Sequence, residues 1–272
     1  MKRILSVLLL FAACYCNAQI ETDRPDFTES PNVVPKGALQ IETGFVFEND
    51  LSAKEQRQSK IQLSERNYTV NTTLFRYGLT ENIELRLNTN YTLSKVGNTN
   101  DIELLDSTHN PILSDIKGFQ TSFIGFKTNL YKNDKLSLGF LGHLYIPALA
   151  SGDFIRTVGQ RVAPEFLVPA TLSLNERWGI SGQFGMAWDG LSSDPSYNYN
   201  LGVGFGISEK VGSYLEAVSY FTAGEELAFL NGGFTYLVTD NFQLDLTGGY
   251  KLTEAAPDYF LSCGLSYRML KK

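Results

Sequence analysis

From Gly37 to its C-terminus, the chain repeats one pattern, in which apolar and polar side chains alternate over stretches bounded by turn-forming residues. Alternation with a period of two is typical of β-strands that have one apolar and one polar face, and no sustained helical periodicity interrupts it. The pattern predicts twelve strands, at 37–48, 67–77, 83–94, 117–131, 136–146, 166–176, 177–189, 197–208, 211–223, 229–238, 241–252 and 258–268.

The connections between these strands alternate between short and long. The short ones are hairpin turns such as Leu79-Thr80-Glu81-Asn82 and Val238-Thr239-Asp240-Asn241. Between them fall the longer connections, at 49–66, 95–116, 147–165, 190–196, 224–228 and 253–257. An even strand number with short turns on one side and longer loops on the other is typical of outer-membrane barrels. This arrangement places both termini on the short-turn side, the periplasm, and a soluble β-sandwich has no reason to show it.

The stretch 177–189 shows the alternation most clearly. Its even positions are almost all apolar and include Trp178 and Trp188, whereas its odd positions are small or polar. Ten residues rising ~3.3 Å each and tilted by ~40° cover roughly 25 Å, the height of the apolar band of a membrane barrel. We therefore expect a transmembrane antiparallel up-and-down β-barrel of about twelve strands over residues 37–272, with Trp178 and Trp188 as membrane-interface anchors.

The polar faces of the strands must point into a wet lumen, because Arg or Lys on the lipid face costs ~2–4 kcal/mol near the midplane. Most of the charged residues on these faces lie nearer the short turns, which predicts one belt of mixed sign towards the periplasm. This belt is either a salt-bridged structural network or a constriction that selects solutes. The candidates for it are Glu42, Glu84, Arg86, Lys127, Glu216, Asp245, Lys251 and Arg268.

The first residues form a separate signal. Lys2 and Arg3 precede the apolar stretch Ile4–Ala13, and small residues favour a cut after Ala18. This stretch is too short to span ~30 Å of hydrocarbon. We expect residues 1–18 to be a secretory signal peptide for export to the bacterial outer membrane, with a lipoprotein signal ending at Cys14 as the alternative. The mature chain then keeps only Cys263, so it forms no internal disulfide.

Residues 19–36 form a polar, extended segment whose path is fixed by proline. It is either a periplasmic lead-in without a task or a plug inside the lumen. As a plug it would use Asp23, Arg24 and Asp26, with Arg24 meeting acidic residues of the wall.

Charge and motif content exclude other classes. Without Lys2 and Arg3 the chain has 23 − 2 = 21 basic and 29 acidic residues, a formal charge of −8, which disfavours nucleic acid as a partner. There are two histidines, His109 in a predicted loop and His143 in a predicted strand, and no Gly-x-Ser-x-Gly or zinc-ligand spacing. We predict no enzymatic activity, no metal and no cofactor. A Ser–His outer-membrane hydrolase remains an alternative.

Several short motifs are similar to a known family. They are Thr22-Asp23-Arg24-Pro25-Asp26, Leu39-Gln40-Ile41-Glu42-Thr43-Gly44-Phe45, Arg76-Tyr77-Gly78-Leu79-Thr80, Pro257-Asp258-Tyr259-Phe260 and Gly264-Leu265-Ser266-Tyr267-Arg268. In this order they resemble the MetA-pathway phenol-degradation family of outer-membrane β-barrel proteins, whose Bacteroidetes members are often labelled transporter. The resemblance implies a barrel that passes small apolar or aromatic compounds. The chain departs from the usual barrel ending, because Met269-Leu270-Lys271-Lys272 stands where a final aromatic residue is common.

The sequence thus predicts an outer-membrane channel or transporter for small solutes. Its expected partners are outer-membrane lipid, the outer-membrane assembly machinery and a small-molecule solute. A closed structural or adhesive barrel that acts through its long extracellular loops is the alternative from another class.

Overall fold

The computed structural model describes residues 19–50, 63–98, 115–156 and 161–270. The predicted signal peptide, His109 and most of the first two predicted long loops lie outside these ranges. Among the described residues, no helix is both long enough and apolar enough to cross a membrane. The strands are β1 (Leu39–Asp50), β2 (Leu63–Gly78), β3 (Ile83–Asn98), β4 (Ile116–Phe119), β5 (Ser122–Lys132), β6 (Leu136–Ile146), β7 (Ala163–Ser173), β8 (Trp178–Ala187), β9 (Ser196–Gly206), β10 (Val211–Thr222), β11 (Glu225–Thr239), β12 (Phe242–Lys251) and β13 (Tyr259–Met269).

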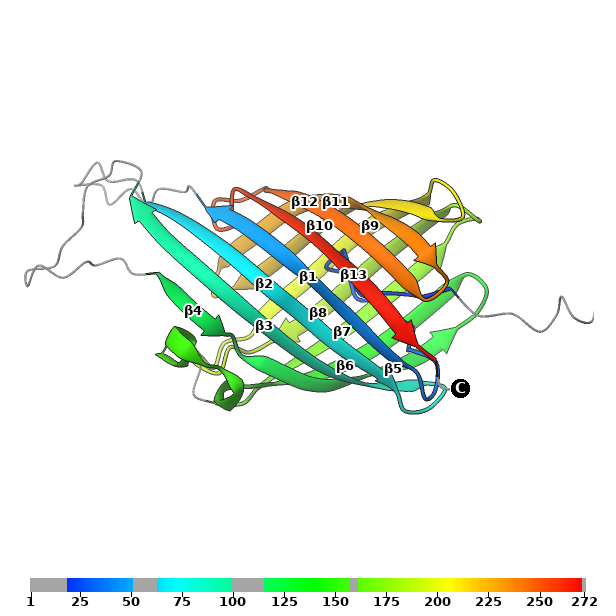
Figure 1. Ribbon diagram of the computed structural model, residues 1–272, viewed down its shortest axis with the longest axis horizontal. Coiled ribbons are helices and arrows are strands. Elements are labelled where there is room, and N and C mark those ends of the chain that lie inside the picture. Colours follow the sequence, from blue (N-terminus) through cyan, green and yellow to red (C-terminus); the bar gives the residue numbers. More distant parts are fainter. Residues whose placement is uncertain (1–18, 51–62, 99–114, 157–160, 271–272) are drawn as a thin grey trace, which may run out of the picture.

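The strands form one closed antiparallel barrel (Figure 1). Apart from β4 and β5, each strand pairs with its neighbours in the chain, and β1 pairs with β13 to close the wall. The short β4 and the longer β5 both pair with β3, so together they form a single interrupted strand. The barrel therefore has twelve strand positions, which confirms the predicted fold. Two short 3-10 helices, η1 (Pro147–Leu149) and η2 (Gly152–Arg156), lie between β6 and β7.

Several predicted boundaries differ from the observed ones, and two of the differences have a clear local cause. The predicted strand 166–176 is displaced, because β7 ends at Ser173 and a turn follows it, in which Asn175 Oδ1 accepts hydrogen bonds from the amides of Arg177 and Trp178. The predicted loop 224–228 is a tight turn at Ala223-Gly224, where both residues have positive φ angles of 51° and 91°. Such angles suit a two-residue hairpin, so β10 and β11 extend almost to each other.

The two faces of the wall differ sharply in polarity. On β12, Leu246 is 56% exposed, whereas its neighbours Asp245 and Thr247 are buried. The same alternation recurs in β8, where Trp178, Ile180 and Phe184 are exposed and Gln183 is buried. Large apolar side chains thus cover the outside and polar ones fill the inside, which is the reverse of a water-soluble domain and matches a hydrocarbon environment.

The polypeptide before β1 lies inside the barrel (Figure 1, dark blue). We call residues 20–36 the N-terminal segment. The amide of Ile20 donates a 2.8 Å hydrogen bond to the carbonyl of Asp240 in the β11–β12 turn, and the amide of Gly37 donates one of 2.7 Å to the carbonyl of Gly78 at the end of β2. Both ends of the N-terminal segment are therefore held at the short-turn end, and the residues between them rise into the lumen.

Candidate functional site

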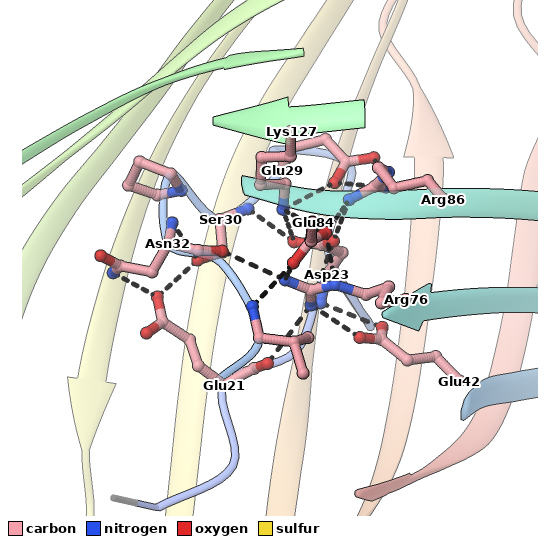
Figure 2. Close-up of polar contacts among 12 residues, drawn as sticks. Glu21, Asp23, Glu29, Ser30, Asn32, Glu42, Arg76, Glu84, Arg86 and Lys127 are labelled. Atoms are coloured by element: carbon pink, nitrogen blue, oxygen red, sulfur yellow. Dashed lines mark hydrogen bonds and ion pairs between the residues drawn. The ribbon is translucent and has the colours of Figure 1, made fainter. Parts of the chain in front are cut away.

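Asp23 of the N-terminal segment is the centre of a buried ionic network (Figure 2). One carboxylate oxygen, Oδ1, lies 2.7 Å from Lys127 Nζ, and the other, Oδ2, lies 2.6 Å from Arg86 Nη1 and 3.1 Å from Arg76 Nη1. The three cations come from three strands, β5, β3 and β2. A single carboxylate thus ties the N-terminal segment to three parts of the wall.

Acidic residues of the wall complete this network. Arg76 donates from Nε to Glu84 Oε1 and from Nη1 to Glu42 Oε1, each at 2.8 Å. Arg86 Nη1 also donates to Glu84 Oε1, at 3.0 Å. These side chains meet because their residues are cross-strand neighbours: Arg76 pairs in register with Arg86, and Glu84 pairs with Lys127.

The N-terminal segment contributes a second acid and its own backbone. Glu29 receives two hydrogen bonds from Arg86 Nη2, at 2.8 and 2.9 Å. The amide of Val34 donates to Glu84 Oε2 at 2.8 Å, and the amide of Ser30 donates to Asp23 Oδ1 at 2.9 Å. Glu84 therefore binds both the arginines of the wall and the backbone of the segment.

The network holds one more acid than base. Its three cations, Arg76, Arg86 and Lys127, face the four carboxyl groups of Asp23, Glu29, Glu42 and Glu84, so the formal charge is 3 − 4 = −1. Burial raises the pKa of Glu29 to about 7, although Arg86 acts to lower it. Burial also acts to raise the pKa of Asp23, but Arg76, Lys127 and Arg86 hold it well below its ordinary value. Glu29 is therefore the residue of the segment that can absorb the excess charge by binding a proton.

Arg24, the residue after Asp23, makes a separate anchor on β12, β13 and β2. Its guanidinium lies 3.1 Å from Asp245 Oδ1 on β12 and donates to the hydroxyls of Thr72 and Ser262 at 2.9 and 3.0 Å. It rests against a pair of glycines, Gly44 and Gly264, where any Cβ atom would lie within 2.5 Å of the guanidinium. The wall is thus shaped to receive this side chain.

The tip of the N-terminal segment contacts β10 and an aromatic cluster. Glu216 on β10 accepts hydrogen bonds from the amide of Phe27 at 2.9 Å and from the hydroxyl of Thr28. The Phe27 ring packs edge-to-face on Phe229 and Phe260, with centroids 4.8 and 5.5 Å away. Asp26 stands beside Glu216, and burial together with that carboxylate raises the pKa of Asp26 well above its ordinary value.

The predicted single belt of charge is wrong in part. Lys251 is the last residue of β12 at the long-loop end, where it pairs with Glu254 and Asp258 at 2.9 Å. Arg268 lies at the short-turn rim and donates to Asn241 Oδ1 at 3.1 Å. Lys251 and Arg268 thus lie at other heights along the barrel than the network. The alternation of residues predicts which face of a strand a side chain is on, but not its height. Of the eight candidates, those inside the network are Glu42, Glu84, Arg86 and Lys127.

The two tryptophans differ in position. Trp178 begins β8, is exposed on the outer face and packs on Phe205 with centroids 4.5 Å apart. Trp188 follows the end of β8, and its indole Nε1 donates to the carbonyl of Ser193 in the next loop at 3.2 Å.

Sequence reasoning missed Arg76, which is fully buried within the network. A bulge at Thr69/Asn71 shifts the register of β2 and obscures its alternation. The outward neighbours Phe75 and Tyr77 would nevertheless have placed Arg76 in the lumen. Glu29, the partner of Arg86, was missed because it lies in a segment without periodicity.

His143 faces the lumen on β6. Its Nδ1 lies 2.7 Å from Glu165 Oε2, and its ring stacks on Phe123 with centroids 4.1 Å apart. These contacts offer a carboxylate and an apolar ring but no nucleophile. Within the described part of the chain, no group of three or more His, Cys, Asp or Glu side chains is arranged to hold a metal ion.

The N-terminal segment does not fill the lumen. Three cavities of about 210, 220 and 240 Å³ border it. Asp26 lines all three, and Arg24 lines the two larger ones. Space for small molecules therefore remains around the segment.

The sequence profile of the family described as "Putative MetA-pathway of phenol degradation" matches residues 22–269. The chain belongs to this family. The predicted resemblance is thus confirmed over nearly the whole barrel, N-terminal segment included. A search of curated proteins found no match.

Solved structures of outer-membrane channels share the fold. A channel from Pseudomonas putida F1 has a TM-score of 0.65 at 16% identity, over 92% of this chain and all of that one. The KdgM porin, in a complex with oligogalacturonate, has a TM-score of 0.50 at 8% identity, over 84% of this chain and 98% of its own. A mutant of TodX, a monoaromatic hydrocarbon channel, has a TM-score of 0.50 at 10% identity, over 88% and 91%. At these identities the likeness shows the barrel architecture.

Proposed function

We propose that this protein is an outer-membrane channel for small solutes, with the N-terminal segment acting as a plug that narrows its lumen. One observation carries the proposal: the wall is apolar outside and polar inside, and the lumen retains cavities beside the segment. A barrel that served only as an anchor has no need for such space. The buried network then has a definite role, which is to hold the plug against the wall.

Localisation follows from the same features. The exposed apolar face requires lipid, and an N-terminal signal peptide over residues 1–18 would export the chain to the outer membrane. Outer-membrane lipid and the assembly machinery are then its partners. We assign it no catalytic activity, because the arrangement of His143, Glu165 and Phe123 includes no nucleophile and the related solved structures are channels and porins.

Small apolar or aromatic compounds are the solute class that we propose. The cavity of about 220 Å³ combines an aromatic side, formed by Phe27 and Phe260, with the polar groups of Arg24 and Asp26. Aromatic faces favour flat rings. TodX is a monoaromatic hydrocarbon channel, whereas the KdgM porin was solved with oligogalacturonate. Because these two structural neighbours differ in solute, the proposed solute class rests on the lining of this lumen.

Single-channel conductance in a planar bilayer tests the proposal. We expect a steady current from the protein and a larger one from a variant that lacks residues 21–30. An equal current from both would show that the segment does not narrow the lumen. A folded barrel that never conducts, with or without the segment, would instead favour a closed barrel that acts through its extracellular loops.

A further inference from the structure

The N-terminal segment makes all its ion pairs on one side of the lumen, to β2, β3 and β5, with Arg24 reaching β12. The amide of Asp23 also donates to Glu42 on β1, and only the tip of the segment reaches β8 and β10, where the amides of Glu29 and Phe27 donate to Gln183 and Glu216. On this side the glycines of the wall are filled by the segment. A Cβ atom at Gly78 would lie 2.5 Å from the carbonyl oxygen of Val34, and one at Gly139 would lie 2.8 Å from the Cα atom of Pro31. The cavity of about 220 Å³ also lies on this side, but no solute can pass at Gly78 and Gly139, where the backbone of the segment is this close to the wall.

The opposite side, on β8 and β9, has a row of small residues that the N-terminal segment does not fill, although a Cβ atom at Gly202 would lie 2.7 Å from Ser181 Oγ. We call Gly179, Ser181, Gly202 and Gly204 the glycine–serine strip. A Cβ atom at Gly204 would meet no other atom within 4 Å, and one at Gly179 would meet only the carbonyl oxygen of Leu172, at 3.6 Å. The strip therefore borders open space on the lumen side.

This space adjoins a second cavity. The strip and the N-terminal segment border the cavity of about 210 Å³, and the cavity of about 240 Å³ lies beside it at Gly206 and Gly212. Both cavities are lined by Thr22, Asp26 and Tyr214. Asp26 has no ion pair with any cation among the described residues, in contrast to Asp23 on the filled side.

We propose that solutes permeate through this gap, between the docked N-terminal segment and the glycine–serine strip, without the segment leaving the lumen. The proposal rests on the channel function and specifies its route. The smaller cavity is lined by the acidic residues Glu21, Asp26 and Glu29 and by no lysine or arginine, and Arg24, which lines the larger cavity, is paired with Asp245. The route therefore admits small uncharged or cationic molecules more readily than anions.

Two cysteine variants test the route. Gly204→Cys is made in a Cys263→Ser background, because Cys263 is the only cysteine after residue 18. A cationic trimethylammonium-ethyl and an anionic sulfonatoethyl methanethiosulfonate are then added to the conducting protein. We expect the cationic reagent to remove most of the current and to react faster than the anionic one. The matched control is Leu201→Cys, whose side chain is 65% exposed on the outer face, and its current should not change.

Gly204→Trp distinguishes two possible routes. In one, solutes pass the docked segment; in the other, the route opens only when the segment leaves the lumen. The open space at Gly204 lets the barrel accept the side chain. If the segment forms the other wall, the tryptophan should remove most of the current in the full protein and little of it in the variant lacking residues 21–30.

Equal loss in both backgrounds would overturn the role of the segment as the other wall. A conducting protein whose current neither Gly204→Trp nor labelling at Gly204→Cys alters would overturn the route and leave the channel function standing. Faster reaction of the anionic reagent would overturn the solute class. An absence of current in the unaltered protein would overturn the channel function itself, and the route with it.

Discussion

Lys127 Nζ lies 2.7 and 2.8 Å from the two carboxylate oxygens of Asp23, although the two residues are 104 positions apart in the chain. Lys127 is fully buried, and so is the Asp23 side chain apart from 2% of its surface. Charges removed from water are tolerated only when they are paired. The docked position of the N-terminal segment therefore depends on this contact and on the two arginines beside it.

Asp23→Asn should weaken docking of the segment by ~3–5 kcal/mol, because it leaves Arg76, Arg86 and Lys127 facing one another with less compensation. We expect a larger and noisier single-channel current. Asp134→Asn, in an exposed turn at the same end of the barrel, is the control and should leave the current unchanged. A quiet current of ordinary size from Asp23→Asn would contradict the role given to this network.

The Asp23–Lys127 contact itself can be measured with a double-mutant cycle. Asp23→Asn, Lys127→Met and the double variant are compared by denaturant unfolding in detergent. We expect a coupling free energy of about 1–3 kcal/mol, because the double variant removes the buried Lys127 charge that Asp23→Asn strands, while Arg76 and Arg86 lose Asp23 in both the single and the double variant. Additive effects would mean that the two side chains act independently.

The current should rise with pH. Burial gives Glu29 in the docked segment a pKa of about 7, above its ordinary value of 4.5, so the docked state binds more protons than the released state between these values. The contribution of Glu29 to the stability of the docked state is therefore fully present below pH ~4.5 and is lost as the pH rises through ~7. Weaker docking at higher pH gives the larger current. The groups that face Glu29 are Arg86, Lys127 and Asp23. The pKa of Asp23 is lowered, so its contribution is lost only at much lower pH.

Glu29→Gln isolates this effect. The glutamine keeps the size of the side chain and cannot ionise, so the rise in current between pH ~5 and ~8 should shrink. The pKa of Asp26 is also raised, so Asp26→Asn combined with Glu29→Gln should shrink the pH dependence at least as much as Glu29→Gln alone. A current that falls with pH in the unaltered protein would be opposite in sign to this account.

Phe27→Ala should release the tip of the segment. Its ring packs on Phe229 and Phe260, and each such pair contributes ~0.5–1.5 kcal/mol beyond area burial. We expect more frequent transitions between current levels in single-channel records. Phe45→Ala removes a ring of the same kind from the outer face of β1 and should not alter the transitions.

Leu246→Arg tests the membrane placement of the wall. Leu246 lies in the middle of β12 on the outer face, so the arginine should cost ~2–4 kcal/mol of folding free energy in lipid. Tyr250→Arg lies on the same face near the end of the strand, where the cost falls to ~0–1 kcal/mol. Equal stabilities of the two variants in lipid vesicles would argue against a buried hydrocarbon-facing band.

Alternation in the sequence predicted which side chains face the lumen, because a strand places successive residues on opposite sides. It predicted β6 at its observed bounds but misplaced β7, because Leu174 continues the apolar pattern beyond the point where Asn175 begins the turn. Periodicity describes faces and carries little information about ends.

Contacts between distant elements could not be predicted in this way. Arg24 was expected to meet an acidic residue of the wall, but its partner, Asp245, depends on the path of a segment that has no regular structure. Lys251 shows the same limit, because its strand ends where the β12–β13 loop supplies Glu254 and Asp258. Polarity of a face can be read from the order of residues, whereas the height and partner of a charge require the assembled barrel.

Both ends of the N-terminal segment are fixed at one rim, by Ile20 on the β11–β12 turn and by the chain itself where it enters β1. If the contacts inside the lumen break, the segment stays covalently joined to the wall. A short tether keeps it at an effective concentration on the order of millimolar near its own binding site. The return of the segment to its docked position is then an intramolecular event. The duration of an open period therefore does not change with the amount of protein in the membrane.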